Sequence, residues 1–132
     1  YDILKWFIEI RDLFDIYIPW LGYDPWHVDE SLKQAFKNEF GKDSMIPVRQ
    51  GVYTLSAPMK ELKADLEAHQ VIYNNNPIDK WCLSNTEIKT DINGNIQPIK
   101  GVDRRKRIDG AVSLIIGYVV LKDKMSEYEN MI

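Results

Sequence analysis

An apolar segment near the C-terminus places the strongest constraint on the fold. Residues 111–121 are mostly apolar, and Ser113 and Gly117 interrupt the run. The run is too short to cross a bilayer. We therefore expect a helix over about 108–130 whose first half is buried, because it is apolar on most faces. The second half of this helix is charged, and we expect it to be exposed to solvent.

The N-terminal part of the chain alternates between helical and extended patterns. Asp2 is a plausible N-cap, and the residues after it have the apolar spacing of one helix face. That face is made by Ile3, Phe7, Ile10 and Phe14. Residues 16–23 are rich in β-branched and aromatic side chains and predict a strand. Because Pro25 disfavours the helical region for the residue before it, we expect Asp24 at the exit of this strand.

Three more helices are expected in the middle of the chain. The spacing of apolar residues predicts one over 28–40, ended by Gly41. Ser56, with Pro58 close behind it, is expected to open the next. A third, short helix follows an asparagine-rich turn at 74–77 and carries Trp81.

Extended segments lie between these helices. A short strand is expected at 46–49, and the segments 87–90 and 95–98 flank Asn93-Gly94, a strong signal for a two-residue hairpin turn. Strands that alternate with helices indicate an α/β layered domain. A length of 132 residues fits one domain.

Composition narrows the possible functions. The net charge is −3, so an interaction with nucleic acid would have to depend on local clusters of charge. A single cysteine, Cys82, cannot form an internal disulfide and favours a reducing, intracellular setting. His27 and His69 are isolated, so no zinc pattern is present, and no Walker-type phosphate loop occurs. No signal peptide is visible.

Asp109 is the first candidate for chemistry. It lies where a basic loop meets the start of the apolar helix. An acidic residue in the first turn of a helix is favoured by the helix dipole, and this role would be structural. The alternative is a metal-binding carboxylate on a rigid helix, with the small residues Gly110, Ser113 and Gly117 near its face leaving room for a neighbouring element.

Asp24 is the second candidate. Ligands gather at the carboxyl ends of strands in open α/β sheets, and Asp24 is expected at such an end. The structural alternative is that Asp24-Pro25 only initiates a turn. If Asp24 and Asp109 meet, two carboxylates could hold Mg²⁺ or Mn²⁺, which prefer oxygen ligands. Asp91 and Asp103 are further acidic candidates, each in a turn or loop.

A cluster of cations precedes Asp109. The loop contains Lys100, Arg104, Arg105, Lys106 and Arg107. Such side chains could neutralise the phosphates of a nucleic acid, with an affinity that falls as salt rises. The alternative is a solvated loop that balances the acidic remainder of the chain.

The order of the short motifs resembles the nuclease region of phage terminase large subunits of the HK97-like branch. The similarity covers about residues 1–122 and rests on a series of motifs in the family's order. They are Tyr23-Asp24-Pro25-Trp26, Arg49-Gln50-Gly51, Thr54-Leu55-Ser56, Pro58-Met59-Lys60, Asn76-Pro77, Trp81-Cys82, Ser84-Asn85, Asp91-Ile92-Asn93-Gly94-Asn95 with Pro98 and Lys100, and Arg107-Ile108-Asp109-Gly110-Ala111-Val112.

The resemblance implies a ribonuclease H-like mixed sheet flanked by helices, and a nuclease that cuts concatemeric double-stranded DNA with Mg²⁺ or Mn²⁺ during genome packaging. By the same resemblance, Asp24 matches the family's second acidic position and Asp109 the third. Both are the expected catalytic and metal-binding residues. Lys100, Arg104, Arg105 and Arg107 would contact the DNA backbone without reading bases.

The resemblance also implies that the chain is an N-terminally truncated nuclease domain. The family's first acidic residue and first strands would precede Tyr1, and the ATPase domain would be absent, so this piece alone could lack activity. We then expect an open edge on the strand at 16–23, which favours association or lower stability. The implied partners are double-stranded DNA, a small terminase subunit and a portal protein, in the cytoplasm of the bacterial host, with no membrane.

Two alternatives remain at this point. The chain could be a non-catalytic module that docks DNA or protein in a packaging or recombination complex, with the basic loop binding and the acids only capping helices. It could also be a recombination or resolvase-like nuclease of the same fold class, which would prefer branched DNA. Metal titration separates the first alternative from a nuclease.

Overall fold

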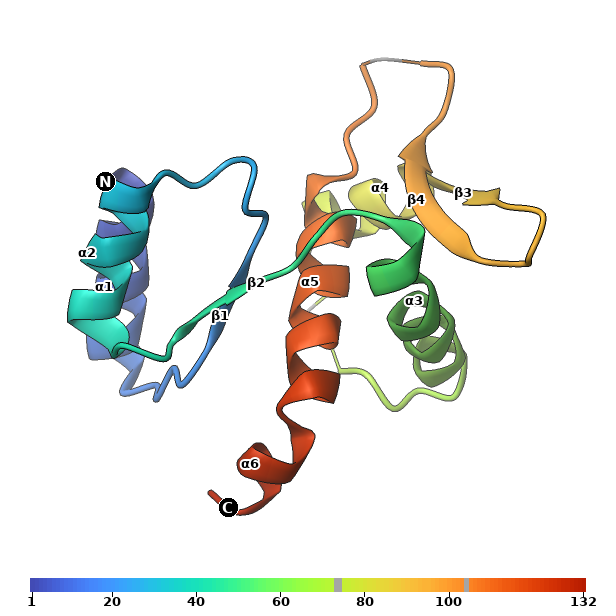
Figure 1. Cartoon of the computed structure of the whole chain (residues 1–132). Coiled ribbons are helices and arrows are strands. Elements are labelled where there is room, and N and C mark those ends of the chain that lie inside the picture. The colour runs from blue at the N-terminus through green and yellow to red at the C-terminus, as the bar shows by residue number, and fades with distance from the viewer. Residues whose placement is uncertain (73–74, 104) are drawn as a thin grey trace. The chain divides into compact units, whose positions relative to one another are not determined.

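A computed structural model describes residues 1–72, 75–103 and 105–132 and divides the chain into two compact units, 1–48 and 49–132. Figure 1 shows both units, and each is described by itself below. None of the helices in the described residues is long and apolar enough to span a membrane. Whether the chain behaves as the single domain expected from its length stays a prediction.

The first unit is built on a β-α-β arrangement preceded by a helix. Its elements are α1 Asp2–Phe14, β1 Leu21–Tyr23, α2 Glu30–Phe40 and β2 Met45–Pro47. The two strands pair in parallel, with Leu21 opposite Met45. A parallel pair needs a crossover connection, and α2 supplies it. The Asp29 side chain caps α2 by accepting a hydrogen bond from the N–H of Leu32 at 2.7 Å, and Gly41 ends the helix at φ 117°.

The core of the first unit is aromatic. Leu21, Phe36 and Met45 are buried together. The Phe36 ring contacts Phe7 at a centroid distance of 5.8 Å and Phe40 at 6.1 Å. The strands are therefore held against both helices mainly by apolar contact.

Three expectations for the first unit were wrong in detail. The strand expected at 16–23 is limited to β1, because residues 16–20 have no strand partner in the described part of the chain and strand preference depends on such neighbours. Helix α1 packs through Leu4 and Phe7, whereas Ile3 and Phe14 are exposed. Its N-cap is Tyr1, so Asp2 is the first helical residue.

The second unit packs three longer helices with a hairpin. Its elements are α3 Val52–Glu67, α4 Pro77–Asn85, β3 Thr86–Thr90, β4 Ile96–Lys100, α5 Asp109–Asp123 and α6 Met125–Glu129. Strands β3 and β4 pair antiparallel, so the hairpin expected between 87 and 98 is confirmed. Helix α4, expected from the Asn76-Pro77 signal, is also confirmed, and the Asn76 side chain caps it.

Helix α5 is central to the core of the second unit, as its composition predicts. Its residues Ala111, Ile115 and Val120 are buried. Further buried side chains come from α3 and α4 and include Leu55, Met59, Leu62 and Cys82. The helix ends at Asp123, with Lys124 as its C-cap, instead of continuing to residue 130, and the short helix α6 that follows has no buried residue. The exposed, charged end expected for this segment is thus confirmed.

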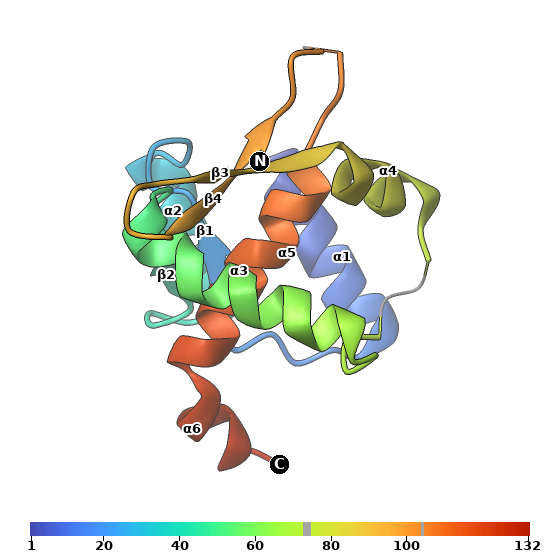
Figure 2. The same cartoon turned by 90° about the vertical axis from the view of Figure 1, so that its right-hand side faces the viewer.

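The β3–β4 hairpin lies beside α3 (Figure 2), and two polar side chains of α3 fix it there. The buried hydroxyl of Ser56 accepts the N–H of Ile96 at 2.9 Å, and Lys60 Nζ donates to the carbonyl of Gly94 at 2.9 Å. The expectation that Ser56 opens this helix was wrong. The helix begins four residues earlier at Val52, because tertiary packing of Leu55 outweighs the one hydrogen bond that Pro58 cannot donate.

The sheets differ from the expected single mixed sheet. The described residues form two separate two-stranded sheets, one parallel and one antiparallel. The class is still α/β, with helices packed on small sheets. The strand expected at 46–49 begins one residue earlier and ends two residues earlier, at Met45–Pro47. The asparagine-rich turn at 74–77 lies partly outside the described residues.

Candidate active site and basic loop

Asp24 directly follows β1, as predicted, in a tight turn. Its Oδ1 accepts the N–H of Trp26 at 3.0 Å, and its backbone carbonyl accepts the N–H of His27 at 3.1 Å. The turn-initiating role considered for Asp24-Pro25 is therefore confirmed. The Oδ2 atom is not used by the turn and lies 3.5 Å from Nε2 of His27. The turn thus uses one carboxylate oxygen of Asp24, and the other faces the His27 imidazole.

The surroundings of Asp24 are open on one side. Its side chain is 19% exposed, whereas the His27 side chain is 81% exposed. Trp26 is also strongly exposed. Sequence reasoning treated His27 as isolated, because only the turn after β1 brings its imidazole to the carboxylate.

Asp109 is the first residue of α5 and is exposed. It follows Ile108, a buried residue that anchors the start of the helix. The Asp109 side chain forms no hydrogen bond or ion pair with another described residue. Its position in the first turn is the one that the helix dipole favours for an acid. The backbone of Asp109 is thus held by the start of the helix, while its carboxylate is exposed to solvent.

A second carboxylate lies against Gly110, the residue after Asp109, and sequence reasoning missed it. Asp79, in the first turn of α4, has its Oδ1 only 2.9 Å from where a β-carbon on Gly110 would stand. Cys82 lies on the same side, with its Cβ 3.3 Å from that position. Asp79 also lines a pocket with Leu83, Gly110, Ser113 and Leu114. The prediction that small residues here admit a neighbouring element is confirmed at Gly110, where that element is α4.

The basic loop joins β4 to α5 and extends away from the hairpin and helices of the second unit (Figure 1). Lys100, Arg105, Lys106 and Arg107 are exposed. Arg104, also expected to contact DNA, lies outside the described residues. The loop therefore presents several cations to solvent immediately before Asp109.

A buried amide fixes the C-terminal end of this loop. Asn85, the last residue of α4, is 6% exposed, and its Nδ2 donates to the carbonyl of Arg107 at 3.0 Å. Breaking this bond would leave a buried amide without a partner, which costs free energy. The bond therefore holds the end of the loop against α4. It also sets where the chain enters α5, and so helps to position Asp109.

The two other acids considered from sequence have structural partners. Asp91 accepts the N–H groups of Asn93 and Asn95, each at 2.9 Å. The backbone hydrogen bond from Asn95, helped by the Asn95 side chain, lowers the pKa of Asp91 below its ordinary value. The hairpin loop spans residues 91–95, so the two-residue turn expected at Asn93-Gly94 was wrong.

Asp103 is paired with Arg105 within the basic loop. Its carboxylate oxygens accept from Nε at 3.1 Å and from Nη2 at 3.2 Å. These side-chain bonds, followed by the backbone N–H of Arg105, lower the pKa of Asp103. Neither Asp91 nor Asp103 is therefore a free carboxylate.

The expected metal ligands belong to different units: Asp24 to the first and Asp109 to the second. Within the described residues, groups of three or more histidine, cysteine or carboxylate side chains suited to a metal do not occur. The Asp109 carboxylate is exposed, and the Oδ2 atom of Asp24 lies 3.5 Å from the exposed imidazole of His27. Oxygen donors of this type suit Mg²⁺ or Mn²⁺.

A solved structure has a fold similar to that of this chain. The chain is similar to the large terminase of bacteriophage HK97, with a TM-score of 0.74 and 19% identity. The match covers 89% of this chain and 24% of that one. At this identity the similarity shows the fold alone.

Sequence comparisons identify a relative and a family. The chain is 39% identical over 83 residues to the protein YmfN of Escherichia coli strain K12, covering 60% of this chain and 18% of that protein. It thus corresponds to about a quarter or less of the length of each relative. Residues 6–127 match the family described as the terminase large subunit, endonuclease domain. The chain therefore belongs to the family of endonuclease domains of terminase large subunits.

Proposed function

We propose that this chain is part of a divalent-metal-dependent endonuclease that cuts concatemeric double-stranded DNA during phage genome packaging. The main support is the position of Asp109: an exposed carboxylate at the start of a buried helix, directly after a basic loop, in a chain of this family. We further propose that it acts in the bacterial host cytoplasm, with a small terminase subunit and a portal protein as partners of the whole protein.

Asp24 and Asp109 are the proposed metal ligands. Asp24 would bind through Oδ2, in place of its contact with the exposed His27 imidazole, because Oδ1 is held by the turn. Asp109 would bind through its exposed carboxylate. A bound Mg²⁺ or Mn²⁺ ion would activate water and stabilise the leaving oxygen of a phosphodiester. Asn85, through the carbonyl of Arg107, and the buried Ile108 fix the backbone immediately before Asp109 begins α5.

The basic loop would hold the DNA. Lys100, Arg104, Arg105 and Arg107 are proposed to contact phosphates, which orients the duplex without reading its sequence. Such contacts give an affinity that falls steeply with salt. The loop would thereby bring a phosphodiester close to Asp109.

Manganese binding tests the proposal. We expect Mn²⁺ to bind the chain, measured by electron paramagnetic resonance, and to bind more weakly after Asp109→Ala or Asp24→Asn. Asp123→Ala is the matched control, because Asp123 is an exposed acid at the other end of the same helix. Cleavage of plasmid DNA in Mn²⁺ should fall with the same variants. Undiminished binding and cleavage in Asp109→Ala would overturn the assignment.

A non-catalytic docking module is the second candidate, favoured by the structural roles of Asp91 and Asp103. Such a module would bind DNA in a salt-sensitive way that neither metal nor the Asp24→Asn and Asp109→Ala changes affect. Absence of Mn²⁺ binding together with unchanged DNA binding would support it over the nuclease.

A further inference from the structure

Within the basic loop, one arginine is held in a fixed orientation. The Asp103 carboxylate accepts three hydrogen bonds from Arg105: one from the backbone N–H at 3.0 Å, one from Nε at 3.1 Å and one from Nη2 at 3.2 Å. The Asp103 carbonyl also accepts the N–H of Lys106 at 3.2 Å. A single residue thus shapes the turn and orients the guanidinium.

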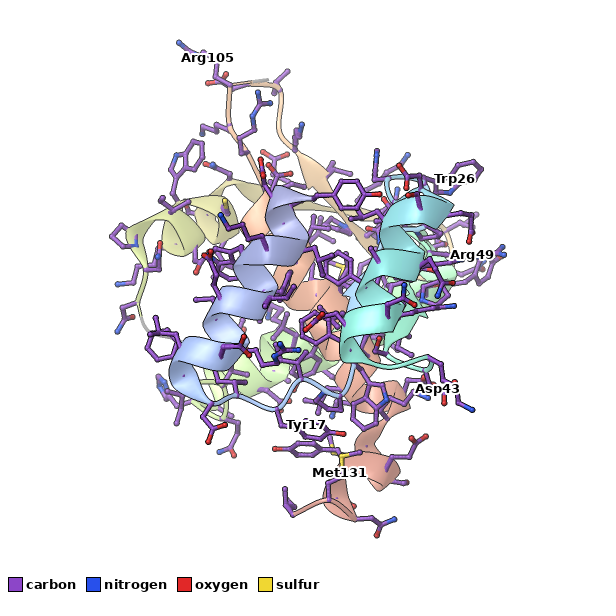
Figure 3. All side chains as sticks on the ribbon, turned by 90° about the vertical axis from the view of Figure 1, so that its left-hand side faces the viewer. Tyr17, Trp26, Asp43, Arg49, Arg105 and Met131 are labelled. Atoms are coloured by element: carbon purple, nitrogen blue, oxygen red, sulfur yellow. The ribbon has the colours of Figure 1, made fainter. Side chains whose placement is uncertain are left out.

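The pair leaves half of the guanidinium free. A guanidinium has five N–H donors in a rigid plane and can hold two anions along different edges. Asp103 occupies the edge formed by Nε and Nη2. The edge formed by Nη1 and the second Nη2 hydrogen faces away from Asp103. The Arg105 side chain is 91% exposed, and Figure 3 shows it at the outer end of the loop.

We propose that Asp103 is a positioning residue for DNA binding: it orients Arg105 so that the free edge of its guanidinium binds one phosphate of the duplex backbone. The inference rests on the proposed DNA-binding role of the loop. A fixed side chain loses less conformational entropy when it binds than a mobile one. Bidentate geometry also suits a phosphate better than the point charge of a lysine.

If Asp103 positions Arg105, removing Asp103 should change the affinity for DNA in the direction opposite to that expected from charge alone. Removing an acid from a basic loop makes the loop more positive, and this should strengthen binding to a polyanion. If Asp103 positions Arg105, its removal weakens binding instead. The sign of the change therefore separates positioning from simple electrostatics.

The test is fluorescence anisotropy of a short labelled DNA duplex with the whole chain at several salt concentrations. We expect Asp103→Ala to raise Kd about threefold to tenfold, and Arg105→Lys to do the same. Arg105→Ala should also reduce the slope of log Kd against log salt by about 1. In the Arg105→Ala background, Asp103→Ala should cause no further weakening. A merely structural role of Asp103 in the loop would weaken binding there too.

Glu87→Gln is the matched control. The Glu87 carboxylate lies at the base of the loop, with Oε1 2.6 Å from where a β-carbon on Gly101 would stand. This change removes the same charge without touching Arg105, and binding should stay equal or become tighter. If Asp103→Ala tightens binding as Glu87→Gln does, the positioning role is wrong while DNA binding stands. If the unchanged chain does not bind the duplex, the proposed function itself fails.

Discussion

The Asp79 carboxylate lies against Gly110, the residue next to Asp109, with its Oδ1 2.9 Å from the position of a β-carbon on Gly110. This contact joins the first turn of α4 to the first turn of α5. It means that the packing of α4 and the placement of the candidate catalytic acid are coupled. Two glycines of α5 allow this to be tested.

Gly110→Ala should destabilise the chain by roughly 1 kcal/mol, because the new methyl group would crowd Asp79 and Cys82. Gly117→Ala is the control on the same helix, since no atom lies within 4 Å of its β-carbon position. There alanine should stabilise the helix by about 0.5–1 kcal/mol. Thermal unfolding should give changes of opposite sign. Equal gains in both variants would show that α4 does not pack tightly on α5.

Asp91→Ala should lower the melting temperature at neutral pH by a few degrees. Asp91 has a folded-state pKa below its ordinary value of 3.8, because it accepts hydrogen bonds in the hairpin loop. The stability that it contributes is therefore present above that ordinary pKa and is lost as pH falls through the lower, folded value.

Melting curves between pH 7 and pH 3 check this prediction. The difference between the unchanged chain and Asp91→Ala should shrink below about pH 4. The effect of Gly117→Ala should persist, since it alters no titratable group. A difference for Asp91→Ala that is constant with pH would contradict the prediction.

Phe36→Ala should destabilise the first unit by about 3–5 kcal/mol, because it leaves a cavity between the two strands and both helices. Phe36 is 5% exposed and contacts two other rings. Phe14→Ala is the matched control: the same truncation at a side chain that is 63% exposed. It should change stability by less than about 0.5 kcal/mol. Similar losses in urea unfolding would show that the core lies elsewhere.

Strand β1 should promote association of the chain at high concentration. It pairs only with β2 among the described residues, so its other edge carries unpaired backbone groups. Such an edge can pair with a strand of another molecule. Analytical ultracentrifugation over a range of concentrations should show a rising average mass. A constant monomer mass would show that this edge is protected.

Several features of the candidate site were predictable because they depend on local chemistry. Pro25 disfavours a helical conformation at Asp24, so its place after a strand followed from the sequence. The cap and proline at Asn76-Pro77 likewise marked the start of α4. The switch from a basic loop to an apolar run placed the beginning of α5 at Asp109.

Other features depended on which segments meet. Residues 16–20 have strand-forming side chains but no strand partner in the described part of the chain, so the expected strand is short. Helix α3 extends through Pro58 because Leu55 is buried, an outcome that local signals oppose. The five-residue loop of the hairpin follows from the hydrogen bonds of Asp91, which the Asn-Gly signal does not encode.

The sequence by itself determined the α/β class, the buried character of α5 and the clustering of cations before Asp109, because these follow from periodicity, capping and charge along the chain. Only the tertiary structure decided that Asp79 lies against Gly110 and that Asn85 fixes the end of the basic loop. Both contacts join residues more than 20 positions apart, and packing between helices sets them. The orientation of Arg105 by Asp103 also required coordinates, because the spacing of two residues is compatible with many side-chain directions.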